Sequence, residues 1–146
     1  MGGKNGSKVS VLTEGNGVPL SLIVTGANRH DSAVLEELLD NRFVPEQPDE
    51  TLQPNLCLDA GYVGKQDIAI SHHYEPHIRP RGEEKKELQN NPDFRARRWV
   101  VESCHSWFKR FRKLCPRYEK TLRSFKGLLS LAAGLIALNK VVVIYG

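Results

Sequence analysis

Two stretches near the amino terminus alternate between apolar and polar residues, as half-buried β-strands do. Residues 8–14 read KVSVLTE and residues 19–25 read PLSLIVT, and both are rich in β-branched residues and leucine. Between them lies Gly15-Asn16-Gly17, a sequence typical of tight turns. The pattern therefore predicts a β-hairpin.

A second pattern has the period of an α-helix and lies in residues 95–113, RARRWVVESCHSWFKRFRK. Its apolar residues recur at steps of three and four, so they form one stripe that predicts a buried face. We expect this helix to end near Cys115 and Pro116, because proline cannot continue a helix. The stripe comprises Val100, Val101, Cys104, Phe108, Phe111 and Leu114, and the polar face comprises Arg98, Glu102, His105, Lys109 and Arg112.

Shorter elements are expected between these two regions. Residues 33–40 have the apolar spacing of a short helix, which Asp31 or Ser32 is placed to cap. Residues 56–58, Leu-Cys-Leu, predict a short buried strand that stops at Asp59. The other expected elements are a surface connection over residues 41–55, a helix over 65–73 and a strand over 77–79.

The carboxyl-terminal part begins with residues 80–92, which are highly charged and predict an exposed loop. Residues 121–139 are apolar nearly all round, so we expect a final helix packed deep in the domain. Asn139 and Lys140 interrupt its apolar run before the roughly 18 residues that span a bilayer, which favours a core helix over a membrane anchor. Residues 1–8 have no apolar segment, so no secretory signal is expected.

The order of these elements is that of an α/β protein. A chain of 146 residues has room for one domain with a real core, and we find no internal repeat. We therefore expect residues 1–146 to form a single domain.

The positive charge is concentrated in the second half of the chain. Residues 79–126 hold 15 Lys and Arg against 6 Asp and Glu, whereas the remaining residues hold 6 basic and 11 acidic residues. Such a local excess favours a polyanionic partner. The alternative is a charged face that is only solvated.

Cys57, Cys104 and Cys115 have no paired spacing, and two of them lie among apolar residues. We interpret them as reduced, buried residues of a cytosolic protein. A zinc site that combines cysteines with His72, His73 and His77 is disfavoured, because no CxxC or HxxxH spacing is present.

Two acids stand in positions that suit metal chemistry. Glu102 is either half of an exposed pair with Arg98 at i,i+4 or a metal ligand flanked by phosphate-binding cations. Asp59 is either a turn-capping residue before Gly61 or a carboxylate at a strand end, where α/β proteins collect ligand-binding groups. If the two carboxylates meet, Mg²⁺ is the ion expected between them.

Three segments of the chain carry a family resemblance. They read GVPLSLIVTGANRHDS, LCLDAGY, and RARRWVVESCHSWFKRFRKL with the later RYEKTLRSFKGLLSL. In this order they resemble DDE transposases of bacterial insertion sequences, in particular the insertion-sequence-5-like group. The second catalytic Asp of that family ends a strand and precedes Gly-Tyr, as Asp59 precedes Gly61 and Tyr62 here. Its third acid lies in the pattern Tyr-x2-Arg-x3-Glu-x6-Lys. Here Arg98, Glu102 and Lys109 match, and Arg95 occupies the tyrosine position.

The resemblance implies a ribonuclease H-like catalytic core and a role for each matching residue. Asp59 and Glu102 would be catalytic and would ligate Mg²⁺ or Mn²⁺. Lys109 and Arg98 would contact DNA phosphates, and Arg112 and Lys113 continue the same basic run. The implied partner is double-stranded DNA, both the terminal repeats of the element and its target, in the bacterial cytoplasm and not at a membrane.

One catalytic position of the family has no match. The family's first Asp ends a strand upstream of the glycine-rich loop, and nothing like it precedes Lys8; Asp31 matches a recurring segment without filling that role. We therefore expect the carboxyl-terminal portion of a transposase catalytic domain. Its ribonuclease H-like fold would be incomplete, with a β-hairpin and short strands packed by helices and the first catalytic strand missing.

Such a chain is expected to bind DNA weakly and not to nick it alone. It would depend on the missing amino-terminal segment or on self-association. Two alternatives remain, a non-catalytic DNA-binding remnant of a transposase and an unrelated structural domain with a solvated charged face.

Overall fold

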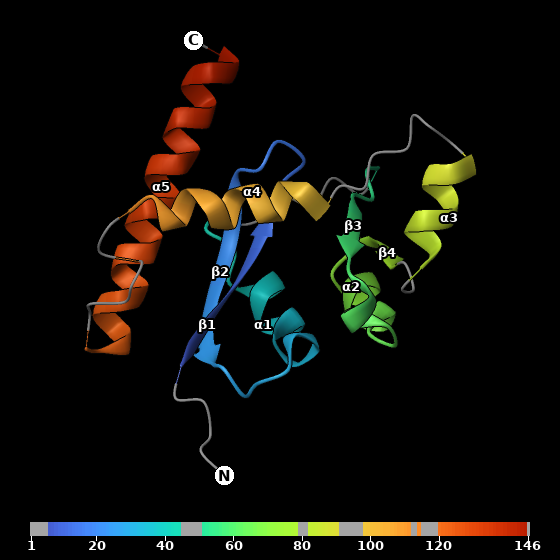
Figure 1. Cartoon of the computed structure of the whole chain (residues 1–146), viewed down its shortest axis with the longest axis horizontal. Coiled ribbons are helices and arrows are strands. Elements are labelled where there is room, and N and C mark those ends of the chain that lie inside the picture. Colours follow the sequence, from blue (N-terminus) through green and yellow to red (C-terminus); the bar gives the residue numbers. More distant parts are fainter. Residues whose placement is uncertain are drawn as a thin grey trace.

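The computed structural model describes residues 6–44, 51–78, 82–90, 98–111, 114 and 120–145. Over these residues the protein is a mixed α/β structure with two separate two-stranded sheets, so the α/β prediction is confirmed. Figure 1 shows an antiparallel hairpin crossed by two long helices, and beside it a smaller unit of short strands and helices.

The predicted hairpin is confirmed. β1 (Ser7–Thr13) pairs antiparallel with β2 (Pro19–Gly26), and a bulge between Leu12 and Thr13 shifts the register near the turn. Within the turn, the Glu14 side chain accepts hydrogen bonds from the backbone N–H groups of Asn16 and Val18, at 2.7 and 3.1 Å. These bonds satisfy turn donors that have no partner in the strand ladder.

Because side chains alternate along a strand, the hairpin has two faces. One face carries Val11 and Val24, which pack against α4 (Arg98–Lys109) and α5 (Leu122–Tyr145). The predicted stripe of α4 supplies buried Cys104 and Phe108 to this core. The other buried members of this core are Leu22, Phe125, Leu129, Ala132, Ala133 and Ile136.

The opposite face of the hairpin is covered by a short helical segment, the 3₁₀ helix η1 (Asp31–Val34) followed by α1 (Leu35–Asp40). Ile23 of β2 packs with Val34 and Leu38 in a second, smaller core, and Leu12 of β1 lies against it. The hairpin is therefore the central layer between α1 on one side and α4 with α5 on the other.

The second sheet consists of β3 (Asn55–Leu58) and β4 (Glu75–Ile78), which run parallel. The chain between them forms the 3₁₀ helix η2 (Ala60–Tyr62) and α2 (Gln66–Ser71). A crossover helix of this kind is what joins parallel strands. This unit is tied to α1 by a third core, formed by Leu35, Leu39, Leu56, Ala69 and Tyr74.

Three local predictions are wrong. Neither Asp31 nor Ser32 caps a helix: His30 precedes η1 and Val34 precedes α1, both without a capping side-chain bond, and Asp31 instead pairs with Lys8 at 2.5 Å. The region expected to be a loop contains α3 (Glu83–Asn90), whose residues EEKKELQN are mostly strong helix formers. Cys57 is exposed, not buried, although it lies in a strand.

The helix that carries Glu102 ends earlier than proline alone would require. After Lys109, the N–H groups of Arg110 and Phe111 bond to carbonyl groups three residues back, which closes α4 with tighter turns. The end is thus set before residue 115 is reached, because these tighter bonds replace the α-helical ones.

The last helix is longer and less buried than the sequence pattern predicts. α5 continues to Tyr145 and extends beyond the body of the protein (Figure 1). By length and composition alone, Leu122–Ile144 would be able to cross a membrane, and only 22% of its most apolar window is buried. The expectation that this helix packs deep in the domain is therefore wrong, because the core contacts one side of it only.

Candidate functional site

Asp59 lies directly after β3, where the sequence placed it, at the start of η2. Its Oδ1 accepts a hydrogen bond from the backbone N–H of Gly61 at 2.7 Å, and the side chain is exposed. A Cβ atom at Gly61 would lie 3.0 Å from this oxygen, so glycine keeps the capping contact unhindered. The turn-capping role of Asp59 is therefore real, and the residue stays exposed.

Two acids, Asp59 and Asp31, lie close to one aromatic residue, Tyr62, to which no role was assigned from the sequence. The pKa of Tyr62 is raised to about 12, first by burial and then by the negative charges of Asp31 and Asp59. η1 and η2 pack against each other, which brings Asp31 and Asp59 to the same phenol. Asp31 is held by Lys8, so this acid already has a cation beside it.

Glu102 lies on the solvent side of α4, and so does Lys109 two turns later. His105 between them is half-buried, and its pKa is lowered by burial and by the positive charge of Lys109. A neutral imidazole is therefore favoured at this point of an otherwise cationic face. Arg98 begins α4, but its side chain lies outside the described part of the structure, as do Arg112 and Lys113.

The two predicted catalytic acids belong to different units. Asp59 follows β3, which pairs with β4, whereas Glu102 lies on α4, which packs against β1. Among the described residues, no group of three or more His, Cys, Asp and Glu side chains is placed to hold a metal ion. These residues therefore do not form a complete metal centre, although carboxylate oxygens are the ligands Mg²⁺ prefers.

A hollow between α4 and α5 combines aromatic and cationic side chains. Its volume is about 290 Å³, and its walls include Phe111 and Ile136, with Arg110 close by. The ammonium group of Lys140 lies 4.2 Å from the ring centre of Trp107, a cation–π contact that joins the two helices. No sequence signal marks this hollow, because Trp107 and Lys140 are 33 positions apart and only packing brings them together.

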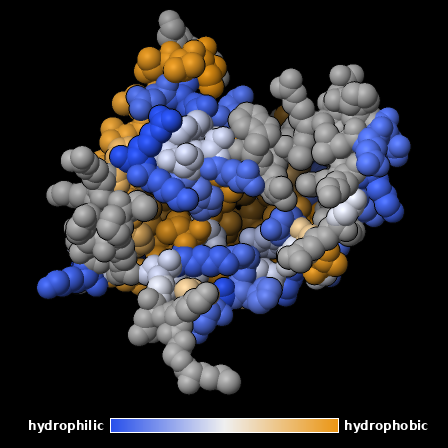
Figure 2. Space-filling view, viewed as in Figure 1, coloured by the Kyte–Doolittle hydropathy of each residue, from blue (hydrophilic) through white to orange (hydrophobic). Residues whose placement is uncertain are grey.

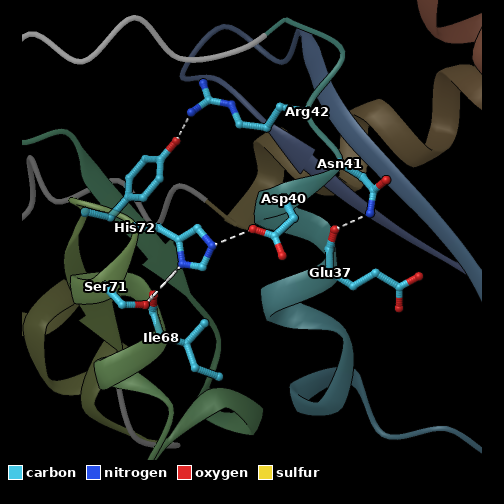
Figure 3. Close-up of polar contacts among 8 residues, drawn as sticks. Glu37, Asp40, Asn41, Arg42, Ile68, Ser71 and His72 are labelled. Carbon is cyan, nitrogen blue, oxygen red and sulfur yellow. Dashed lines mark hydrogen bonds and ion pairs between the residues drawn. The ribbon is translucent and has the colours of Figure 1, made fainter.

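Ser71, His72 and Asp40 form a polar cluster that has the residue types of a nucleophilic triad (Figure 3). His72 Nε2 lies 2.8 Å from Asp40 Oδ1, and Ser71 Oγ lies 3.2 Å from His72 Nδ1. However, the Ser71 hydroxyl donates to the Ile68 carbonyl at 2.8 Å, and His72 Nδ1 contacts the same oxygen at 2.8 Å. The serine is therefore not activated by the imidazole, and the cluster fastens α2 to α1.

Comparison with known proteins shows the family to which the chain belongs. The family model described as "Transposase DDE domain" matches residues 2–139, nearly the whole chain. The chain belongs to this family, and its resemblance to DDE transposases of bacterial insertion sequences is confirmed.

One relative is the "Putative transposase for insertion sequence element IS402" of Burkholderia cepacia. The two are 32% identical over 138 residues, which cover 92% of this chain and 64% of the relative. The chain thus spans just under two thirds of the length of that protein. No solved structure matches the chain.

Proposed function

We propose that this chain carries part of the DNA strand-cutting and strand-joining chemistry of transposition, at the ends of a bacterial insertion sequence. The observation that carries this proposal is the position of two exposed acids in a member of the transposase DDE family. Asp59 lies at the end of a parallel strand, and Glu102 lies on α4 with Lys109 on the same exposed face.

In this proposal Asp59 and Glu102 are metal ligands. Mg²⁺ or Mn²⁺, when bound, would polarise the scissile phosphate and activate the attacking oxygen. Both side chains are exposed and offer oxygen donors, but the described residues offer no group of three ligands. We therefore propose that a further carboxylate comes from outside these residues, and the greater length of the relative leaves room for one.

The proposed DNA contact runs along α4. Lys109 is exposed and lies seven residues after Glu102, so a phosphate beside the carboxylate is within its reach. Arg98, Arg112 and Lys113 are proposed to bind phosphates on either side of it. Such contacts position DNA without reading its sequence.

We further propose that the two small sheets are parts of one incomplete ribonuclease H-like sheet. Each sheet has two strands within the described residues, so a further strand could be added at a sheet edge. An additional strand that ends in an acid would satisfy an edge and would add a carboxylate to the site. The amino-terminal segment of a longer transposase is the proposed source of this strand.

The second candidate is a non-catalytic DNA-binding remnant. It is favoured by one specific observation, the lack of a three-ligand metal group among the described residues. Both candidates predict DNA binding that weakens as salt is added, because cations on the protein displace counterions from phosphates. The two candidates differ in DNA cleavage, which only the first one predicts once the missing carboxylate is supplied.

The test begins with binding of the chain to a labelled duplex between about 50 and 200 mM salt. We expect weak binding that falls steeply with salt, and Lys109→Ala should reduce the slope of log K against log salt by about 1. Lys86→Ala, at an exposed position of α3, is the matched control and should leave the slope unchanged. Binding that does not respond to salt would contradict both candidates.

Cleavage is then measured on supercoiled plasmid with Mg²⁺ or Mn²⁺. We expect no nicking by the 146-residue chain alone, and efficient nicking would contradict that expectation. If the DNA upstream of the Met1 codon encodes a strand ending in Asp, the extended chain should nick. That activity should be lost in Asp59→Ala and Glu102→Ala but kept in Asp67→Ala, an exposed acid on α2. An extended chain that binds but does not nick would favour the remnant.

A further inference from the structure

The hollow between α4 and α5 presents positive charge beside aromatic and apolar walls. Its cations are Arg110, just after the end of α4, and Lys140 of α5, and no acid lines it among the described residues. Its apolar walls include Phe111 and Ile136, and the exposed Asn139 lines it as well. In Figure 2 the apolar end of α5 gives way to hydrophilic surface where this helix passes α4. We name this site the α4–α5 hollow.

The ammonium group of Lys140 is held at the wall of the α4–α5 hollow. It lies 4.2 Å from the ring centre of Trp107. The indole is itself placed by the hairpin turn, because a Cβ atom at Gly17 would lie only 3.2 Å from Cη2 of the ring. A lysine side chain that is already ordered loses less conformational entropy when it binds an anion. The indole therefore prepares Lys140 for an anionic ligand.

The surrounding sequence strengthens the preference for an anion. Residues 103–146 hold nine Lys and Arg against a single acid, Glu119. Within the described part of the structure, the Arg110 guanidinium and the Asn139 amide make no hydrogen bond or ion pair. Both residues are exposed, so these donors are available to a ligand. An anion that offers several acceptor oxygens would satisfy them.

The side chains of the α4–α5 hollow suit a ligand with both a phosphate and a flat ring. Two cations fit phosphate oxygens, which accept charge-assisted hydrogen bonds. Aromatic walls fit the face of a nucleobase, since stacking on such side chains stabilises any base. The volume of about 290 Å³ lies at the lower end of small-molecule sites, so it suits one nucleotide. Paired bases are covered by their neighbours in a duplex, so this nucleotide has to be free or unpaired.

We propose that the α4–α5 hollow binds one nucleotide, with its phosphate at Arg110 and Lys140 and its base against Phe111. Two sources share this chemistry, a free mononucleotide and an unpaired nucleotide of a DNA strand. Neither Glu102 nor Lys109 is among the residues that line the hollow. The inference therefore stands apart from the proposed function, which concerns duplex phosphates along α4, and it holds whether or not the chain cuts DNA.

The experiment is equilibrium dialysis of radiolabelled deoxyadenosine monophosphate against the full 146-residue chain, from about 10 µM to 5 mM ligand. We expect one site with a dissociation constant of about 0.1–1 mM, as for a small ligand held by few contacts. Deoxyadenosine and inorganic phosphate each engage only part of the hollow, so each should compete at least about tenfold less well. A nucleoside or phosphate that competes as well as the nucleotide would contradict the proposal.

Arg110→Gln and Lys140→Gln should each raise this dissociation constant by about tenfold, because a charge-assisted hydrogen bond is lost. Lys126→Gln removes the same charge from an exposed position of α5 that does not line the hollow, so it is the matched control and should bind as the parent does. Phe111→Ala should weaken binding of the nucleotide but not of phosphate. Circular dichroism checks the fold of each variant. Because Phe111 packs against the core, the exposed Arg110→Gln keeps the test decisive if Phe111→Ala does not fold.

A deoxyadenylate strand of about 12 nucleotides, alone or paired with its complement, separates the two sources. Displacement of the label by the single strand at a lower nucleotide concentration than by the free mononucleotide assigns the hollow to DNA. Displacement by the mononucleotide only assigns it to free nucleotides. The proposal is overturned by no binding at 5 mM, by equal displacement with the duplex, or by binding that both Gln variants leave unchanged. The salt dependence of duplex binding in Lys109→Ala is a separate measurement, so failure of one proposal is recognised without the other.

Discussion

His72 Nε2 and Asp40 Oδ1 lie 2.8 Å apart, and this contact joins the end of α2 to the end of α1 (Figure 3). The other ring nitrogen, Nδ1, lies 2.8 Å from the carbonyl oxygen of Ile68. Both nitrogens thus face acceptors, and only the protonated imidazole can donate to both. The hydrogen bond to Asp40, and then the one to Ile68, raises the pKa of His72 above its usual value of 6.5.

This geometry makes the junction between α1 and α2 sensitive to pH. Since the pKa is higher in the folded than in the unfolded protein, the stabilising effect is complete below pH 6.5 and is lost as pH rises through the raised pKa. His72→Gln should therefore reduce the free energy of unfolding at pH 5.5–6 by about 0.5–1 kcal/mol, the range of exposed ion pairs. At alkaline pH the variant and the parent should be nearly equal.

The measurement is urea unfolding of both proteins across this pH range. Asp40→Asn provides the reciprocal variant and should show the same loss in acid. A difference between variant and parent that grows with increasing pH would contradict the assigned sign. His105 works in the opposite direction, because burial lowers its pKa, and it is present in all the proteins compared.

Gly17 in the hairpin turn is predicted to resist substitution. Its φ is +87°, and a Cβ atom there would lie 3.2 Å from Cη2 of Trp107. Gly17→Ala should lower the free energy of unfolding by about 1–2 kcal/mol, because an L side chain is strained at this φ and crowds the indole. Gly15→Ala is the control, since a Cβ atom there meets nothing within 4 Å. Equal stability of the two variants in thermal unfolding would refute the assignment.

The thiols of Cys57 and Cys104 should differ in reactivity. Cys57 is exposed, whereas Cys104 is fully buried and burial raises its pKa to about 11. A thiol needs both access and a thiolate to react. Cys57→Ser should therefore remove a rapidly reacting thiol from titration with a disulfide reagent at pH 8, while Cys104→Ala should leave the rapid phase unchanged. If the rapid phase were lost in Cys104→Ala but kept in Cys57→Ser, Cys104 would be the accessible thiol and the assignment would be wrong.

Two leucines of α5 provide a direct test of which side of the helix is buried. Leu129 is 2% exposed and Leu131 is 63% exposed. Leu129→Ala should cost about 2–5 kcal/mol of unfolding free energy, as for a buried leucine whose removal leaves a cavity. Leu131→Ala should cost less than about 0.5 kcal/mol, because the side chain is already exposed in the folded protein. Chemical denaturation at about 1 µM separates the two effects.

Much of the fold could be predicted from local pattern. The alternation of Val9 and Val11 with Lys8 and Ser10 is a property of the strand itself, and the stripe through Cys104 and Phe108 is a property of the helix itself. Both were predicted correctly because burial repeats with the period of the element. The helix over Glu83–Asn90 was missed because its sequence, EEKKELQN, holds a single apolar residue and therefore has no apolar periodicity.

Part of the candidate site could be predicted from the sequence. Asp59 was expected at the end of a strand, and it lies there because Leu56 is buried and Gly61 permits the turn. The positions of Asp31 near Tyr62 and of Lys140 over Trp107 had no sequence signal, since each pair joins elements that only packing brings together.

The sequence by itself determined which residues alternate, which recur along a helix and which segments carry the transposase motifs, because these properties depend on neighbours along the chain. Only the tertiary structure decided how strands group into sheets and which side of α5 meets the core. An apolar helix with no polar side is compatible with burial all round or on one side, and the number of neighbours available to cover it makes the choice. Here the hairpin and α4 cover one side, and Leu131, Leu135 and Leu138 stay open to solvent.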